Sequence, residues 1–322
     1  MAADDADGLS SDSDTQHLNT RVAWYYYIGS MTQQEIADRL GLTRLRVNKI
    51  IGQARADGSV QIEINMPLAS CVALEESLKS RYGLVDVVVV PSVKDEEVQK
   101  RVIGEAAGLM LGGLLRDGQI IGVGWGGTLV ASVKRLTQRR HPRSRVVSLM
   151  GGLTRGSAAN TFEVATDLAR VLGAECHYIP SPLYYPNDES FASLLGHRPL
   201  AEVMAEARRA DVALVACGDL SGRSQLFSAV SLESRQIADL KALGTVGEVL
   251  GTFLDAEGVP VDHPLNSRVM ALHPADLKAV KATILASGDT YKLPVIRAIL
   301  RGGYINRLVT DEAVAEALLR GA

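Results

Sequence analysis

The segment from Thr32 to Asp57 constrains the fold most, because it carries the signals for two short helices joined by a tight turn. Thr32 precedes an apolar pattern and Glu35 stands three residues later, which is the capping box of a helix start. Gly41 would end this helix, because glycine enters the left-handed conformation without a Cβ clash. Thr43 can then cap a second helix. The pattern predicts a helix-turn-helix.

The second predicted helix has an apolar face and a polar, basic face. Val47, Ile50, Ile51 and Ala54 would point inward. In a helix-turn-helix the N-terminal end of the second helix enters the major groove, where arginine and lysine pair with guanine and asparagine pairs with adenine. The side chains that we expect to contact DNA are Thr32, Gln33, Thr43, Arg44, Arg46, Asn48, Lys49 and Arg55.

The charge of this segment supports a nucleic-acid partner. Residues 21–58 contain six Lys or Arg side chains and three Asp or Glu, whereas the whole chain has a net charge of −3. Positive charge is therefore concentrated on the helical hairpin, where it would neutralise phosphates. An ordinary helical hairpin with a solvated basic face is the structural alternative.

Two flanking elements complete a predicted DNA-binding domain at residues 18–67. The stretch 59–65, SVQIEIN, alternates apolar and polar residues, which predicts a half-buried strand and suggests a wing. The stretch 18–28, rich in aromatic side chains, predicts a first helix that packs on the other two. Residues 1–17 carry five Asp and no Lys or Arg, so we expect an acidic disordered tail there.

Composition is that of a globular protein of the cytoplasm. The 322 residues are 47% hydrophobic and 22% charged, and no run of about 18 apolar residues is present. The N-terminus lacks the basic-then-apolar pattern of a secretion signal. Three widely spaced cysteines fit neither a disulfide framework nor a zinc site, and favour a reducing compartment. We therefore expect a cytoplasmic protein with no metal site and no membrane partner.

Residues 68–322 alternate between strand and helix patterns. After a linking helix at 68–82, the β-branched run at 84–92 predicts a strand covered on both faces. Repeated β-α pairs predict an α/β fold with a doubly wound, mostly parallel sheet, which binds ligands beyond the carboxyl ends of its strands. The further strands expected are 119–123, 145–150, 175–179, 211–216, 280–287 and 304–309, and the further helices are 95–115, 128–139, 160–172, 199–209, 232–243, 291–301 and 311–319.

The sharpest motif of this second domain is IIGVGWGGTL at residues 120–129. It formally matches G-x-G-x-x-G, but the acidic residue that a dinucleotide site wants about 20 positions later is missing, so we expect no cofactor. Gly124, Gly126 and Gly127 let the backbone turn its N–H groups outward, next to Trp125, and Thr128 opens a helix. This arrangement predicts an anion cradle suited to phosphate. A plain tight turn between strand and helix is the alternative.

Polar residues follow several of the other predicted strands. Asn160 follows one strand, Asp219 and Gln225 follow another, and Lys292 stands just inside a helix start after a third. Such side chains suit a polyhydroxylated or phosphorylated ligand at the sheet edge. Each could equally be a turn residue or a solvated charge.

The sequence shows no catalytic set. The six histidines have no H-x-x-x-H or H-E-x-x-H spacing, and G-x-S-x-G is absent. A ligand-responsive DNA-binding regulator is the first hypothesis. A sugar-phosphate isomerase or kinase with an accessory helical domain is the second, and its general base would have to be Asp219 or Asp262. The third is a non-catalytic assembly module that uses the basic hairpin for protein partners.

The chain resembles the SorC/DeoR-type sugar-binding transcriptional regulators of bacteria. The segments that carry the resemblance are MTQQEIADRLGL, GVGWGGTL, ADVALVACG, LGTVGEVLGTFLDAEG, HPLNSRV and AILRGGYINRLVTDEAVAEALL, in this order over about residues 20–320. The resemblance implies a winged helix-turn-helix and an effector domain, residues 68–322, shaped like sugar-phosphate isomerases but without catalysis. It also implies a dimer or tetramer and a sugar, polyol or sugar-phosphate effector, and within the family the regulators of sorbitol- or mannitol-type operons look most similar.

Carried onto this chain, the resemblance places the anion loop at 124–128, an effector-contacting lysine at Lys292 and an arginine at Arg268. The family often has Gly-Gly before that lysine, whereas this chain has Asp289, whose charge favours a neutral polyol over a phosphate. Some members hold their effector through a Schiff-base lysine on an earlier strand. Here that strand ends in Met150, so no covalent adduct is expected.

Overall fold

The computed structural model describes residues 7–29, 31–60, 69–137, 140–152, 160–230 and 232–320. The chain divides into two compact units, Met1–Pro67 and Leu68–Ala322. Within the described ranges, no helix is both long and apolar enough to cross a bilayer.

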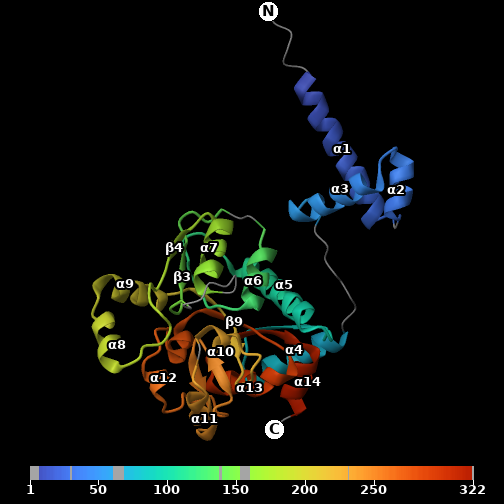
Figure 1. Cartoon of the computed structure of the whole chain (residues 1–322). Coiled ribbons are helices and arrows are strands. Elements are labelled where there is room, and N and C mark those ends of the chain that lie inside the picture. The colour runs from blue at the N-terminus through green and yellow to red at the C-terminus, as the bar shows by residue number, and fades with distance from the viewer. Residues whose placement is uncertain are drawn as a thin grey trace, which may run out of the picture. The chain divides into compact units, whose positions relative to one another are not determined.

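The described part of the N-terminal unit contains the helices α1 (Asp7–Tyr27), α2 (Gln33–Leu40) and α3 (Arg44–Ala56) (Figure 1). The capping box is present: Thr32 N donates to Glu35 Oε2 at 2.7 Å, and Glu35 N donates to Thr32 Oγ1 at 3.3 Å. Gly41 ends α2 with φ 65°, and the Thr43 hydroxyl accepts from Arg46 N at the start of α3. The helix-turn-helix prediction is confirmed, and its core is formed by Val22, Ile36, Ala37, Val47, Ile50 and Ile51.

The first helix begins earlier than the sequence indicated. A disordered tail was expected at residues 1–17, but α1 starts at Asp7, so the expectation is wrong from that residue on. Extending a helix costs much less than nucleating one, and the packed part of α1 around Val22 supplies the nucleus. No proline interrupts the extension. The strand predicted at 59–65 falls mostly on residues 61–68, which lie outside the described ranges.

The C-terminal unit is built on a seven-stranded, fully parallel sheet with the order β1-β10-β9-β5-β2-β3-β4. Its strands are β1 (Asp86–Val90), β2 (Ile120–Val123), β3 (Arg145–Ser148), β4 (Glu175–His177), β5 (Val212–Val215), β9 (Ala282–Ala286) and β10 (Arg307–Asp311). The predicted α/β class with a doubly wound parallel sheet is confirmed. The chain runs outward through β2, β3 and β4, and then returns to place β5 on the other side of β2.

Helices cover both faces of this sheet (Figure 1). The helices described in this unit are α4 (Ala69–Tyr82), α5 (Glu96–Leu114), α6 (Gly127–Arg135), α7 (Thr161–Leu172), α8 (Asp188–Leu195), α9 (Arg198–Ala207), α10 (Gln225–Val230), α11 (Ser234–Ala242), α12 (Pro264–Ser267), α13 (Leu293–Gly302) and α14 (Glu312–Arg320), with the 3-10 turns η1 (Pro274–Ala279) and η2 (Thr290–Lys292). Successive residues of one strand face opposite cores: Val212 and Leu214 pack with α5, α6 and α7, whereas Ala213 and Val215 pack with α4, α13 and α14. Burial on both faces explains the continuous apolar runs.

A small second sheet lies beside the main one and was not predicted. It is antiparallel and contains β6 (Cys217–Gly218), β7 (Gly247–Val249) and β8 (Thr252–Leu254). The hairpin between β7 and β8 turns through Leu250 at φ 51° and Gly251 at φ 76°. Strands of two or three residues carry too little alternation to be recognised in a sequence.

Candidate effector pocket and DNA-binding surface

A pocket open to solvent lies at the carboxyl ends of β2 and β5. These two strands flank the point where the strand order reverses, which is the usual ligand position in an open α/β sheet. We call it the switch-point pocket. Its lining residues are Lys100, Trp125, Gly126, Gly127, Thr128, Ala216, Cys217, Asp219, Arg223, Ser224, Leu226, Glu248, Tyr291 and Lys292.

The glycine loop after β2 forms one wall. Gly124 N donates to Leu214 O at 2.9 Å, which ties the loop to β5. Gly126 has φ 125° and ψ 156°, a conformation open essentially to glycine alone, and it precedes the first turn of α6. The first N–H groups of a helix have no acceptor within the helix, so the start of α6 offers backbone donors to the pocket.

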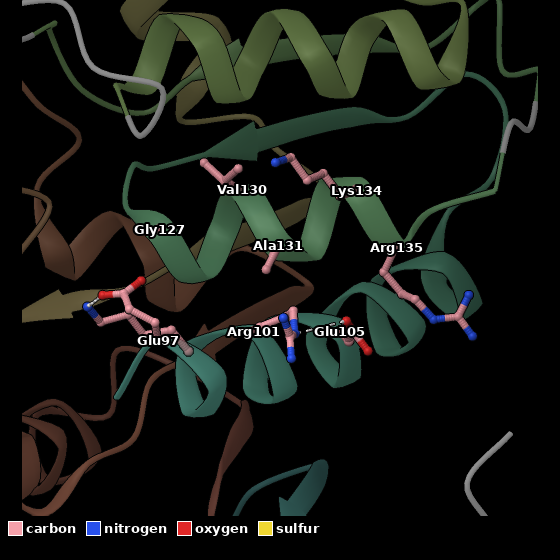
Figure 2. Close-up of a pocket in the computed structure, with 9 residues that line it drawn as sticks. Glu97, Arg101, Glu105, Gly127, Val130, Ala131, Lys134 and Arg135 are labelled. Carbon is pink, nitrogen blue, oxygen red and sulfur yellow. Dashed lines mark hydrogen bonds and ion pairs between the residues drawn. The ribbon is translucent and has the colours of Figure 1, made fainter. Parts of the chain in front are cut away.

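Helix α6 is held close to α5 by glycines. A Cβ at Gly104 would lie 2.5 Å from Thr128 O, and one at Gly108 would lie 2.4 Å from Ser132 O. A hollow between the two helices has charged rims, with Glu97, Arg101 and Glu105 on α5 and Lys134 and Arg135 on α6 (Figure 2). The close packing fixes the backbone position of α6 and therefore of the donors at its start.

The opposite wall carries two buried carboxyl groups. Asp219 is 7% exposed, and its Oδ2 accepts from Ser221 N at 3.0 Å. Glu248 is 3% exposed, and its Oε2 accepts from Gly251 N at 2.8 Å. Burial raises the pKa of Glu248 to about 7, against the lowering effects of the Gly251 N–H and the Lys292 charge. Glu248 therefore titrates near neutral pH.

Three cations surround the pocket, and two of them are ion-paired. Lys100 Nζ lies 2.6 Å from Glu97 Oε1 and Arg223 lies 2.7 Å from Glu96 Oε1. Lys292, at the end of η2, forms no ion pair with a described residue. Its Nζ lies 5.5 Å from the ring centre of Tyr291, on whose ring Arg223 also packs at 5.2 Å.

Asp289 precedes η2 in a strained conformation. Its φ is 69°, which is rare for a residue with a Cβ. Its N–H donates to the buried Asp311 Oδ2 at 2.8 Å, which holds the turn. Burial raises the pKa of the Asp289 carboxyl, Lys292 lowers it, and the charges of Asp311 and Glu96 raise it further.

The structure brings together six of the ten residues predicted to contact the effector, and these are Trp125, Gly126, Gly127, Thr128, Asp219 and Lys292. Gly124 does not line the pocket, and its N–H is bonded to Leu214 O. Gln225 begins α10, and its side chain lies outside the described part of the chain. Asn160 is buried at the start of α7 and does not line the pocket.

Arg268 is also absent from the pocket lining. Its guanidinium donates to the carbonyl oxygen of Pro264 at 3.0 Å and to that of Pro186. These bonds tie together two loops of the C-terminal unit. In this structure the guanidinium of Arg268 therefore bonds to backbone outside the pocket, and its contact with an effector stays a prediction.

The sequence did not single out Glu248, Ser224 or Tyr291. Glu248 reaches the pocket because β7 pairs with β6, in the register Gly218 to Glu248, across about thirty residues. Ser224 Oγ is buried and has no hydrogen-bond partner within the described ranges. No local pattern marks such positions, although Glu248 stands within the segment TVGEVLG.

The outer face of α3 is exposed and basic. Arg44, Arg46, Asn48 and Lys49 all stand in solvent, and Gln33 Nε2 donates to Asn48 Oδ1 at 3.3 Å. The arrangement resembles a recognition helix with its polar side chains held ready for base edges. Two further side chains bear on the set of residues expected to contact DNA, because Leu45 was not predicted and Arg55 is already hydrogen-bonded. Leu45 is 79% exposed between two arginines, and Arg55 Nε donates to the Tyr27 hydroxyl at 2.6 Å.

No group of three or more His, Cys, Asp or Glu that could hold a metal occurs in the described ranges. Cys71, Cys176 and Cys217 are all free thiols, and burial raises the pKa of Cys217 to about 11. The Cys217 thiol donates to Ser287 Oγ at 3.2 Å. A thiol with so high a pKa is unsuited to nucleophilic chemistry at neutral pH.

Comparison with known proteins identifies the family. The family "Putative sugar-binding domain" matches residues 66–320. The chain is 32% identical over 304 residues to the erythritol catabolism regulatory protein EryD of Brucella abortus, with 94% of this chain and 96% of that protein covered. It is 33% identical over 306 residues to the transcriptional regulator LsrR of Escherichia coli O139:H28, with 93% of each covered. The full-length sorbitol operon regulator SorC from Klebsiella pneumoniae has a TM-score of 0.72 and 29% identity, over 95% of this chain and 99% of that one.

The fold and the pocket define a sugar-binding α/β domain joined to a helix-turn-helix. The chain belongs to the SorC/DeoR-type family of sugar-binding transcriptional regulators. The family resemblance read from the sequence is thereby confirmed. The relatives are named as regulators, which does not favour the isomerase alternative.

Proposed function

We propose that this protein regulates transcription of a carbohydrate or polyol catabolic operon, and that a small effector in the switch-point pocket controls its affinity for operator DNA. The observation that carries the proposal is one chain with an exposed basic recognition helix and a separate α/β unit whose pocket holds polar groups at the strand ends. The relatives named for erythritol catabolism and for the sorbitol operon support this class of operon.

DNA contacts are assigned to residues 18–67. Arg44, Arg46 and Lys49 would pair with guanine or phosphate, and Asn48 would pair with adenine. Leu45, exposed between the two arginines, would contact a thymine methyl group. Thr32 and Thr43 cap their helices and would approach phosphates, and Arg55 would reach the backbone from its position beside Tyr27.

The effector is assigned to residues 68–322 and is a sugar, a polyol or a sugar phosphate. Backbone donors at the start of α6, the ammonium of Lys292 and the carboxyl groups of Asp219 and Glu248 would bind it. The effector changes the affinity for DNA only as far as it binds two conformational states of the protein with different affinities. The protein would act in the cytoplasm and without catalysis. It would act as a dimer or tetramer, because two copies of the DNA-binding domain read the paired half-sites of an operator.

The DNA half of the proposal is tested with a duplex selected by the full-length chain from a random-sequence library. Fluorescence anisotropy measures its Kd for the native chain and for Arg44→Ala with Lys49→Ala. Each lost contact is worth about 1–3 kcal/mol, so the double variant should bind at least roughly thirtyfold more weakly. Arg235→Ala with Lys241→Ala on α11 removes the same charge elsewhere and should bind normally. Unchanged binding by the α3 variant would refute the assignment of the recognition helix.

A further inference from the structure

We propose that the effector is an uncharged polyol or sugar, and that carboxyl groups around Lys292 exclude its phosphate esters. This inference rests on the proposed function in one respect, namely that the switch-point pocket is the effector site. A glycine loop at a helix start alone would allow either a neutral sugar or polyol or a phosphate ester, and the inference excludes the phosphate ester.

Two of the three cations that line the pocket already form ion pairs with acidic side chains of α5. Lys100 is paired with Glu97 and Arg223 is paired with Glu96, both at less than 3 Å. Lys292 is the one pocket cation that forms no ion pair with a described residue. A phosphate dianion bound here would therefore meet a single positive charge that is not already ion-paired. Phosphate sites, by contrast, generally use several cations or a bidentate arginine.

Carboxyl groups outnumber that one charge. Asp219 and Glu248 line the pocket, and both are buried. Asp289 lies close enough for its charge to interact with Lys292. The pKa values of Glu248 and Asp289 are both raised, by burial first and by neighbouring acids in addition. Negative charge is therefore already unfavourable in this pocket. A dianion would add to this repulsion.

The hydrogen-bonding groups of the pocket match hydroxyl groups better than phosphate oxygens. The start of α6 and Lys292 donate, whereas Asp219 and ionised Glu248 accept. A hydroxyl both donates and accepts, so one polyol can satisfy both walls at once. The oxygens of a phosphate dianion only accept, so a phosphoryl group against the acidic wall could donate no hydrogen bond to Asp219 or to ionised Glu248. The buried Ser224 Oγ, unpartnered within the described ranges, adds a group that a hydroxyl can meet.

The carboxyl group of Asp289 stands at a position where the backbone conformation is strained. The φ of 69° at this position favours glycine, and an aspartate there is strained. The Asp311 carboxylate accepts the Asp289 N–H and holds the strained turn beside the pocket. A carboxyl group is thus present where the backbone alone would favour a residue without a side chain.

The test compares matched pairs of ligands on the full-length protein. Isothermal titration calorimetry is run at pH 7.5 with erythritol, xylitol, sorbitol and mannitol, and with the monophosphate of each. The proposal predicts that at least one free polyol binds and that its monophosphate binds at least tenfold more weakly. A monophosphate that binds more tightly than its parent, or a panel in which no uncharged member binds, would overturn it.

Variants test the cause of the discrimination. Asp289→Asn removes the charge, and asparagine tolerates positive φ. The ratio of the Kd of the phosphate ester to the Kd of its parent polyol should therefore fall severalfold. Asp262→Asn, at an exposed position, should leave it unchanged. Equal effects of the two variants would contradict the role of Asp289. DNA anisotropy with the same ligands reports separately on the proposed function, because a polyol that binds without altering DNA affinity would refute regulation and leave the ligand class standing.

Discussion

A Cβ at position 218 would lie only 2.5 Å from Oε1 of Glu248, so Gly218 leaves the space that this buried carboxyl group occupies. The two residues are direct partners in the antiparallel pair β6–β7. The small sheet thereby places an acid inside the switch-point pocket, facing Lys292 and Asp219.

Glu248 should make the stability of the protein depend on pH. Its folded-state pKa of about 7 lies above the ordinary 4.5, so folding favours the protonated form. The stabilisation is complete below pH 4.5 and is lost as the pH rises through 7, by roughly 3 kcal/mol in total. Glu248→Gln should therefore unfold at a higher temperature than the native chain at pH 8, with a smaller difference at pH 5. Thermal unfolding at both pH values measures this.

The control for this prediction is Glu189→Gln on α8, whose glutamate is exposed. It should show no such dependence on pH. A constant difference between native and Glu248→Gln at pH 5 and pH 8 would show that Glu248 does not titrate in this range.

The backbone of Gly126 should not tolerate a side chain. A Cβ there has room, with Ala216 Cβ 3.8 Å away as its nearest neighbour, so the cost comes from φ 125° itself. Gly126→Ala should lower the free energy of unfolding by about 1–3 kcal/mol. It should also reduce the thermal shift caused by the effector, because the donors at the start of α6 move. Gly113→Ala, in α5 with open space around it, should be neutral or slightly stabilising. Equal stability of the two variants would argue against the strained loop.

The approach of α5 to α6 should depend on the glycines between them. Gly108→Ala places a Cβ 2.4 Å from the Ser132 carbonyl oxygen, which is backbone and cannot rotate away. Overpacking of this kind costs about 1–3 kcal/mol, and it should displace α6. Urea unfolding measures the loss of stability and calorimetry measures the weaker effector binding. Native-like stability of Gly108→Ala would mean that the helices separate without cost.

Local signals in the sequence were enough for the helix-turn-helix. Thr32 and Glu35 cap each other, and Gly41 takes the left-handed turn, because all three effects act within a few residues. The sheet was equally predictable, since burial on both faces leaves long apolar runs. The early start of α1 at Asp7 was missed because composition alone does not show a helix extending from a packed nucleus.

The pocket was predictable only where its residues follow a main strand. The glycine loop, Asp219 and Lys292 were found in this way. Glu248 was missed because its position depends on pairing between segments far apart in the sequence. Arg268 was assigned to the effector by resemblance, but here its guanidinium is bonded to two proline carbonyls.

Coupling between the switch-point pocket and DNA binding is measured as the DNA affinity of the full-length chain with and without a saturating effector from the polyol panel. We expect the effector to change the Kd for the selected duplex by about 5- to 150-fold, the usual range of coupling between two sites. The change should disappear in Lys292→Ala, while DNA binding without effector stays as in the native chain. An effector that binds the pocket and leaves the Kd for DNA unchanged would show that the pocket does not control DNA binding.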